Sequence, residues 1–275
     1  MQQTIISPTT AAIRIEQLRR TFGEIVAVEG LDLTIPSGLI YGLLGPNGAG
    51  KSTTIKMLTT ILPPTSGKAF VAGYNIVTES QIVRRKIGYV PQMLSADGAL
   101  SGYENLMLSA KLYGMEHSER KPRIDTMLEL MGLTDASTRL VKTYSGGMIR
   151  RLELAQAMLH HPSVLFLDEP TIGLDPVARR SVWEKLHELQ QTYRTTILIT
   201  THDMEEADEL CDELAIMHRG KLAVSGRPSD LKASIGEDAN LNDVFIYYSG
   251  ASASLDEGGT FRDIRQTRNT ARRLG

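Results

Sequence analysis

Cysteine and long apolar runs are scarce in this sequence. Its 275 residues include one cysteine, Cys211, which can build neither a disulfide framework nor a cysteine-based zinc site. The apolar runs at Leu39–Leu44 and Val164–Leu167 are far shorter than the roughly 20 residues that a membrane-spanning helix needs. We therefore expect a protein of a reducing compartment without a membrane-spanning segment.

A net positive charge is also missing. The formal net charge of -2 at pH 7 provides no general basic field to collect phosphates, so direct binding of nucleic acid is disfavoured. Residues 1–10 are polar and lack the charged start and apolar stretch of a secretory signal. This second observation indicates a protein that stays in the cytoplasm.

Strands of two kinds are predicted. Ile13–Leu18 and Leu31–Ile35 alternate apolar and polar residues, as half-exposed antiparallel strands do, whereas Leu39–Leu44 is apolar on both faces. Two further buried strands, Val164–Leu167 and Thr196–Thr200, flank a helical stretch over residues 176–191. That spacing predicts a strand–helix–strand unit with parallel strands and therefore an α/β fold.

The middle and the end of the chain differ from these regions in sequence pattern and composition. Between Tyr103 and His161, apolar residues repeat at helical spacing, which predicts an all-helical insert. The residues that carry this pattern are Ile124, Met127, Leu128 and Met131, then Leu152, Ala155 and Leu159. From Asn240 onward the sequence is rich in Gly, Ser and Arg apart from an apolar patch, Val244–Tyr248, and we expect a loosely attached tail.

The strongest chemical pattern lies between the buried strand and a helix-like run over residues 54–62. Successive backbone N–H groups of such a glycine-rich loop, together with the positive end of the following helix, form an anion site for polyphosphate. Lys51 would reach the terminal phosphates, and the Ser52 hydroxyl would coordinate magnesium. The alternative is a glycine-rich turn that caps a helix. The loop is Gly45, Pro46, Asn47, Gly48, Ala49, Gly50, Lys51, Ser52 and Thr53.

Two adjacent carboxylates, Asp168 and Glu169, end the buried strand that begins at Val164. An unpaired buried charge is costly, so a cation is the expected partner. Asp168 would bind Mg²⁺ through water, and Glu169 would orient or deprotonate the water that attacks the terminal phosphate. A solvated strand end that enters a proline turn is the alternative.

A second helix start, Ser145-Gly146-Gly147, offers another anion site, because Ser145 is a good N-cap and the glycines leave backbone donors open. By itself this pattern is more often a plain helix cap.

From about Ile13 to Gly226, the order and spacing of these motifs resemble the nucleotide-binding subunit of the ATP-binding cassette (ABC) family. Ser145-Gly146-Gly147 matches its signature, although Tyr144 and Met148 stand where leucine and glutamine are usual. The resemblance implies further site residues: Phe22 stacking on adenine, Gln92 touching magnesium and sensing the permease, Gly173, Leu174 and Asp175 contacting the second chain, and His202 gripping the terminal phosphate.

The resemblance also implies the architecture, a P-loop NTPase core of the RecA-like type, mainly a parallel sheet, with an antiparallel β-subdomain and an inserted helical subdomain. Residues 1–236 would form the nucleotide-binding domain, with the core and β-subdomain in 11–92 and 162–236 and the helical subdomain in 93–161. Residues 237–275 would be a loosely attached extension.

The implied function is that of an ATPase on the cytoplasmic side of the membrane. Two copies of the chain would pair head-to-tail around two ATP molecules and drive a separate permease, and the segment Leu241–Phe245 favours an exporter. Two alternatives remain. A soluble cassette ATPase would act on nucleic acid or the ribosome, but such proteins carry coiled-coil arms or a second cassette. A non-catalytic regulator is disfavoured by Glu169 and His202.

Overall fold

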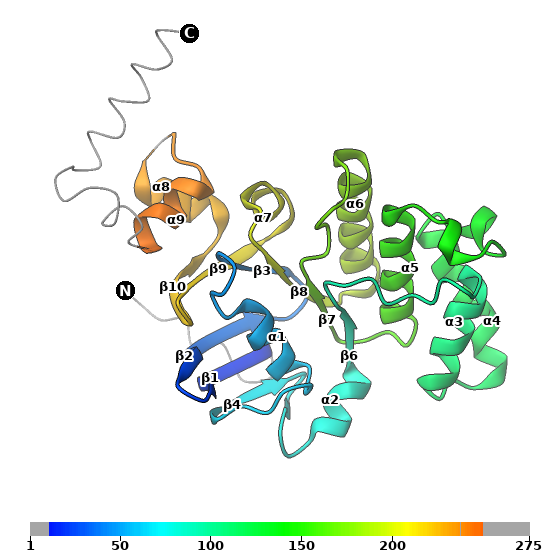
Figure 1. Cartoon of the computed structure of the whole chain (residues 1–275), viewed down its shortest axis with the longest axis horizontal. Coiled ribbons are helices and arrows are strands. Elements are labelled where there is room, and N and C mark those ends of the chain that lie inside the picture. Colours follow the sequence, from blue (N-terminus) through cyan, green and yellow to red (C-terminus); the bar gives the residue numbers. More distant parts are fainter. Residues whose placement is uncertain (1–10, 237, 250–275) are drawn as a thin grey trace, which may run out of the picture.

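The computed structural model describes residues 11–236 and 238–249. The smaller of its two sheets is antiparallel, with four strands in the order β2-β1-β4-β5 (Figure 1). The strands are β1 (Ala11–Phe22), β2 (Ile25–Pro36), β4 (Ser66–Val71) and β5 (Tyr74–Asn75). The outer antiparallel pair predicted from alternation is confirmed, because β1 and β2 pair along nearly their whole length.

The larger sheet has six strands in the order β10-β9-β3-β8-β7-β6. Its strands are β3 (Ile40–Leu44), β6 (Ile87–Val90), β7 (Val164–Asp168), β8 (Thr196–Thr201), β9 (Glu213–His218) and β10 (Lys221–Gly226). The five strands from β9 to β6 are parallel, and β10 is antiparallel to β9. The predicted parallel unit is therefore confirmed, with a helix (Pro176–Tyr193) between β7 and β8.

The helices of the described residues are α1 (Lys51–Leu58), α2 (Ser80–Lys86), α3 (Gly102–Leu112), α4 (His117–Leu130), α5 (Gly146–Met158), α6 (Pro176–Tyr193), α7 (Met204–Leu210), α8 (Pro228–Ile235) and α9 (Leu241–Ser249). Two short 3-10 turns cover Thr134–Ala136 and Val141–Thr143. The prediction for the first helix was wrong at both ends. It begins directly at the phosphate loop with Lys51, and it ends before Thr60, whose φ of 63° is not helical.

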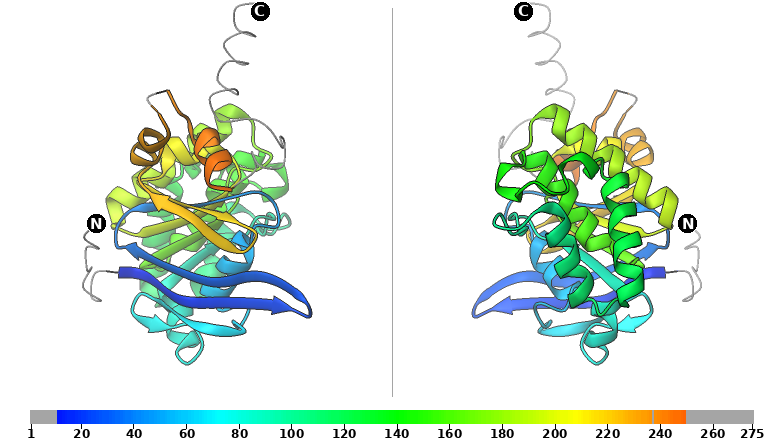
Figure 2. Two further views of the ribbon diagram at one scale, coloured as in Figure 1. Left: turned by 90° about the vertical axis from the view of Figure 1, so that its left-hand side faces the viewer. Right: turned by 90° about the vertical axis from the view of Figure 1, so that its right-hand side faces the viewer.

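The predicted helical insert contains α3, α4 and α5. Figures 1 and 2 show these helices at the end of the molecule remote from β1 and β2. The apolar residues that predicted α4, Ile124, Met127 and Leu128, are buried. Tyr144 is buried as well, and its hydroxyl donates to the Ala136 carbonyl at 2.7 Å. The departure from leucine at position 144 thus supplies an internal hydrogen bond.

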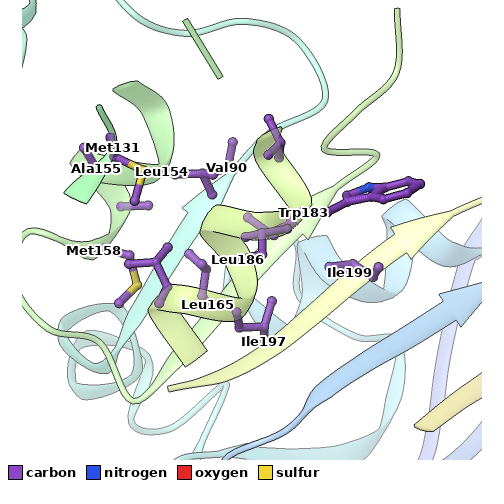
Figure 3. Packing of buried hydrophobic residues seen from close by; sticks show 14 of the residues in the cluster. Val90, Met131, Leu154, Ala155, Met158, Leu165, Trp183, Leu186, Ile197 and Ile199 are labelled. Atoms are coloured by element: carbon purple, nitrogen blue, oxygen red, sulfur yellow. The ribbon is translucent and has the colours of Figure 1, made fainter. Parts of the chain in front are cut away.

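Both faces of the large sheet are buried, against different elements. On one face, Tyr41, Leu43, Phe166 and Leu198 pack with α1 and the antiparallel sheet. On the other face, the alternate residues of the same strands pack with α5 and α6, as Figure 3 shows for Leu165, Ile197 and Leu186. The near-continuous apolar composition of these strands follows from this double burial. It also separates α1 from α5 by the thickness of a sheet.

The C-terminal extension differs from the prediction. Residues 241–249 form α9, with Leu241 and Val244 buried against the body of the protein, so a loosely attached extension is wrong for this segment. The apolar patch of the sequence is the face on which this helix packs. The composition of the tail did not indicate this packing. The five arginines of the tail, Arg262, Arg265, Arg268, Arg272 and Arg273, lie outside the described residues.

None of the helices within residues 11–236 and 238–249 is both long and apolar enough to cross a membrane.

Candidate functional site

The predicted phosphate loop joins β3 to α1 and packs tightly against β9. A Cβ on Gly45 would lie 2.3 Å from the Met217 carbonyl oxygen, and φ at Gly45 is 152°, so only glycine fits there. The buried Lys51 folds back over the loop, and its Nζ donates to the Gly45 carbonyl at 2.7 Å and to the Pro46 carbonyl at 3.3 Å. The ammonium group of Lys51 is therefore held against the backbone of the loop.

Asp168 lies beside this loop at the end of β7. Its Oδ1 accepts hydrogen bonds from the Ser52 hydroxyl at 2.9 Å and from the Thr200 hydroxyl at 2.6 Å. Thr200 is the residue that pairs with Asp168 across the parallel strands β7 and β8. Burial and the charge of Asp168 raise the pKa of Tyr89, on the neighbouring β6, to about 12. Ser52 is therefore close enough to Asp168 to be a second ligand of the predicted Mg²⁺ ion.

Glu169 is buried between two basic side chains. Its Oε1 lies 3.5 Å from Nζ of Lys51, and its Oε2 lies 2.7 Å from Nδ1 of His202. The backbone of Glu169 has a φ of 53°, a conformation that is uncommon for residues other than glycine. Such strain persists only where the surroundings enforce it, and here the Glu169 amide is held by the Thr200 carbonyl and hydroxyl. The structure thus brings together the predicted Lys51, Ser52, Asp168, Glu169 and His202.

The signature residues lie elsewhere. Ser145 caps α5, its hydroxyl accepting from the Met148 amide at 3.3 Å, and it is exposed. A Cβ on Gly146 would lie 3.2 Å from a methyl of Leu174, so the signature meets the predicted contact residues at Leu174. Within the described residues, no hydrogen bond or ion pair joins Ser145–Gly147 to the phosphate loop. One chain therefore presents the two predicted anion sites on separate elements, α1 and α5.

Phe22 occupies the tip of the β1–β2 hairpin. Phe22 is 45% exposed, so it does not pack in the core. The Arg20 guanidinium stacks over the ring at 4.6 Å from its centroid. The hairpin also approaches the phosphate loop, because a Cβ on Gly50 would lie 2.5 Å from the Ala27 carbonyl. Ile25, two residues before Ala27, pairs with Phe22.

Gln92 follows β6, the strand that pairs with β7. Its side chain is exposed, and its backbone carbonyl accepts a hydrogen bond from Arg150 at 3.0 Å. Gln92 is thus at the same edge of the sheet as Asp168, although no contact between their side chains is present in this structure.

The comparisons with known proteins agree with this geometry. The family model described as "ABC transporter" matches residues 28–172. The chain is 44% identical to the daunorubicin/doxorubicin resistance ATP-binding protein DrrA of Streptomyces peucetius, over 83% of this chain and 69% of the relative. It is 38% identical to the linearmycin resistance ATP-binding protein LnrL of Bacillus subtilis (strain 168), over 85% and 77%.

This chain belongs to the ABC transporter family. It is an ATP-binding protein that hydrolyses ATP. A solved ATP-binding subunit of an ABC transporter superposes with a TM-score of 0.77 at 27% identity, covering 86% of this chain and 99% of that structure. The cbiO1 protein of Clostridium perfringens, part of the transporter complex cbiONQ, gives 0.75 at 28% identity over 82% and 91%. The predicted P-loop NTPase fold is confirmed, whereas the subdomain boundaries stay a prediction.

Two acidic residues of this ABC subunit have partners that the sequence analysis did not find. Asp203, next to His202, caps α7 by accepting from the Glu205 amide at 2.9 Å, and its other oxygen lies 2.7 Å from Arg179 of α6. Glu206 is buried and accepts from the Thr171 hydroxyl at 2.6 Å and from the Trp183 indole at 3.0 Å.

These contacts tie the segment after Glu169 to the helix after His202. A signal for Glu206 was present in the sequence, because it falls in helical phase with Leu210, which is buried.

Glu206→Ala tests this tie. Removing the carboxylate leaves two buried donors without an acceptor, so we expect a loss of about 2–4 kcal/mol in the free energy of unfolding. Glu206→Gln keeps an acceptor oxygen and is expected to recover most of the loss. Glu205→Ala, on the exposed face of the same helix, is the matched control. Chemical denaturation of the three variants provides the measurement, and equal stability of Glu206→Ala and Glu205→Ala would contradict the assignment.

Proposed function

We propose that this ABC ATPase couples ATP-driven dimerisation to the export of a substrate through a separate membrane permease. The observation that carries the proposal is the convergence of Lys51, Asp168, Glu169 and His202 at one edge of the sheet, with the signature on another element. The relatives DrrA and LnrL, named for resistance to daunorubicin/doxorubicin and to linearmycin, support the exporter type. The chain would work at the cytoplasmic side of the membrane, attached through the permease.

The phosphates of ATP fit the loop between β3 and α1. The Nζ of Lys51 already lies against the loop backbone, and a phosphate oxygen bound there would replace the two backbone carbonyls as its acceptor. The exposed ring of Phe22, on a hairpin that touches the loop, is available to stack on adenine. The loop residues from Gly45 to Thr53 would thus surround the triphosphate.

Magnesium fits the oxygen donors beside the loop. The Ser52 hydroxyl and the Asp168 carboxylate, 2.9 Å apart, are hard ligands of the kind that Mg²⁺ takes, and Gln92 at the same sheet edge would add an amide oxygen. Ser52 would bind directly and Asp168 through water. When bound, the ion supplies positive charge to the phosphate oxygens.

Glu169 is suited to orient or deprotonate the attacking water. A carboxylate only accepts hydrogen bonds, so His202 donates through Nδ1 to Oε2 of Glu169. A ring that carries both protons would also donate through Nε2 to the terminal phosphate. Lys51 neutralises part of the Glu169 charge before ATP enters. A terminal phosphate that draws Lys51 to itself leaves Glu169 free to take a proton from water.

The second half of each site would come from another copy of the chain. Ser145 and Gly146 are exposed and Gly147 is buried, and Gly146 lies against Leu174 of the predicted contact residues Gly173, Leu174 and Asp175. The first N–H groups of a helix such as α5 have no partner within the helix and are available to an anion. A head-to-tail homodimer presents this surface to the partner's ATP and completes two sites at once.

The permease would dock near Gln92 and the helical insert. Large apolar side chains are exposed there, at Met93 and Leu94 after β6 and at Leu108 and Leu112 of α3. Exposed apolar side chains of this kind suit an apolar partner segment. The alternative of a soluble ABC ATPase that acts on nucleic acid is disfavoured, because among the described residues the longest helix of the insert is α4, with 14 residues, too short for a coiled-coil arm.

Glu169→Gln tests the proposal. The amide keeps the shape of the side chain and loses the base, so the variant is expected to bind ATP-Mg, to accumulate as a closed dimer and to turn over at least about 100-fold more slowly. Turnover and retained nucleotide are measured on the purified chain together with its size by light scattering. Turnover within a factor of two of the natural sequence would contradict the role of Glu169 in activating the attacking water.

Phe22→Ala tests the adenine contact. Loss of base stacking costs about 1–3 kcal/mol, so KM for ATP is expected to rise about 5- to 150-fold. The phosphates are held by other residues, so kcat is expected to stay the same. Steady-state kinetics give both constants, and a KM equal to that of the natural sequence would rule out the stacking role.

A further inference from the structure

The loop after β6, residues 91–98, is held by hydrogen bonds from side chains of α3 and α5, while its tip is exposed. Met93 is 82% exposed and Leu94 51%, which makes an apolar tip. The rest of the loop is held by side chains of two helices: Arg150 and Glu153 of α5, and Asn105 of α3. We call residues 91–98 the Gln92 loop.

Arg150 holds the start of the Gln92 loop. One guanidinium nitrogen donates to the Pro91 carbonyl at 2.9 Å, and the other donates to the Gln92 carbonyl at 3.0 Å. The side chain of Arg150 is 2% exposed. Its planar fork reaches two successive carbonyls, which an ammonium group could not do in the same way.

Glu153 holds the middle of the same loop. Its Oε1 accepts hydrogen bonds from the Ser95 amide, from the Ser95 hydroxyl at 3.1 Å and from the Ala96 amide at 3.4 Å. Its Oε2 lies 3.0 Å from Arg150 in a fully buried ion pair. Asn105 continues the grip at Asp97, accepting from its amide at 2.9 Å and donating to its carbonyl at 3.0 Å.

A buried ion pair is weak evidence for stability, because apolar residues of similar volume often serve equally well. Here both charges direct their remaining hydrogen bonds to one loop, and that loop carries Gln92. The pair also stands on α5, the helix that Ser145 caps. Arg150 and Glu153 lie about 7.5 and 12 Å along the axis from Ser145, so the helix links them to the signature as a rigid body.

We propose that Arg150 and Glu153 are positioning residues that couple the two ATP sites of the dimer, an inference that rests on the proposed two-chain site. The signature of one chain contacts the ATP on its partner, while Gln92 of the same chain serves the ATP on its own phosphate loop. When α5 moves with the partner's nucleotide, the ion pair carries the Gln92 loop along. One bound ATP thereby sets the position of a residue at the other site.

The test uses the full-length chain with Arg150→Met and Glu153→Met combined, which removes both charges and leaves neither unpaired. The matched control is Arg151→Met, because Arg151 is the next residue of α5 and bonds to the Met131 carbonyl rather than to the loop. ATP hydrolysis is measured against ATP concentration, and binding of a fluorescent ATP analogue to the open chain is measured separately.

We expect a Hill coefficient approaching about 2 for the natural sequence and the control, and about 1 for the double variant, since it cannot exceed the number of coupled sites. Affinity for the analogue is expected to stay within about two-fold, because the phosphate loop is untouched. Equal Hill coefficients in all three proteins would overturn the coupling. A Hill coefficient of about 1 in the natural sequence would do so as well, and an equal loss of affinity and cooperativity would mark a merely structural pair.

Amide hydrogen exchange tests the hydrogen bonds from the Gln92 loop to Glu153, and this measurement does not depend on the dimer. The Ser95 and Ala96 amides are expected to exchange at least about tenfold faster in the double variant than in Arg151→Met. Unchanged exchange overturns the proposal. Should the double variant fail to fold, Arg150→Lys keeps the charge without the fork, and a Hill coefficient equal to that of the natural sequence would contradict the inference.

Glu169→Gln, measured beside these variants, distinguishes failure of the proposed function from failure of the coupling. Failure of Glu169→Gln to retain ATP would contradict the proposed function, and the coupling would fall with it. Retention of ATP together with cooperativity that survives loss of the ion pair would contradict the coupling alone.

Discussion

The parallel pairing of β3, β8 and β7 is the constraint on which the site depends. Parallel strands end at one edge of a sheet, and these three end at the phosphate loop, at Thr201 and at Asp168. The register is fixed because both faces of the strands are buried, so a shift by one residue would turn the apolar side chains of one core into the other. The hydrogen bonds from Ser52 and Thr200 to Asp168 are a direct product of that register.

The same sheet keeps the two anion sites apart. α1 packs on one face and α5 on the other, so the lysine of the phosphate loop and the signature serine are carried by different layers of the molecule. In our account this separation is what makes ATP a link between two chains. It also makes α5 the natural place for a coupling device, since α5 holds both the signature and the Gln92 loop.

Much of the core and of the site followed from the sequence, for physical reasons that can be named. Doubly buried strands are continuous apolar runs, and a phosphate loop needs glycines at fixed spacing, so both are visible without a structure. The contacts of Arg150 and Glu153 were not found, because a buried charge on a helix looks like any solvated charge until its partners, distant in sequence, are placed. For Glu206, the helical phase with Leu210 indicated burial, but its partners Thr171 and Trp183 were visible only in the structure. Residues 241–249 were misjudged because polar composition around the patch concealed an amphipathic helix.

The shared ATP site is the central claim, and complementation between defective chains tests it most directly. One batch carries Lys51→Ala and another Ser145→Arg, and each alone is expected to be nearly inactive. In a mixed dimer one site receives both defects, and the other combines an intact phosphate loop with an intact signature. With random exchange, about a quarter of all sites should recover in a two-fold dimer, so ATPase activity rises as one batch is titrated with the other. If exchange is confirmed by a tag and activity stays at the baseline of the separate batches, each site is built within a single chain and the account is wrong.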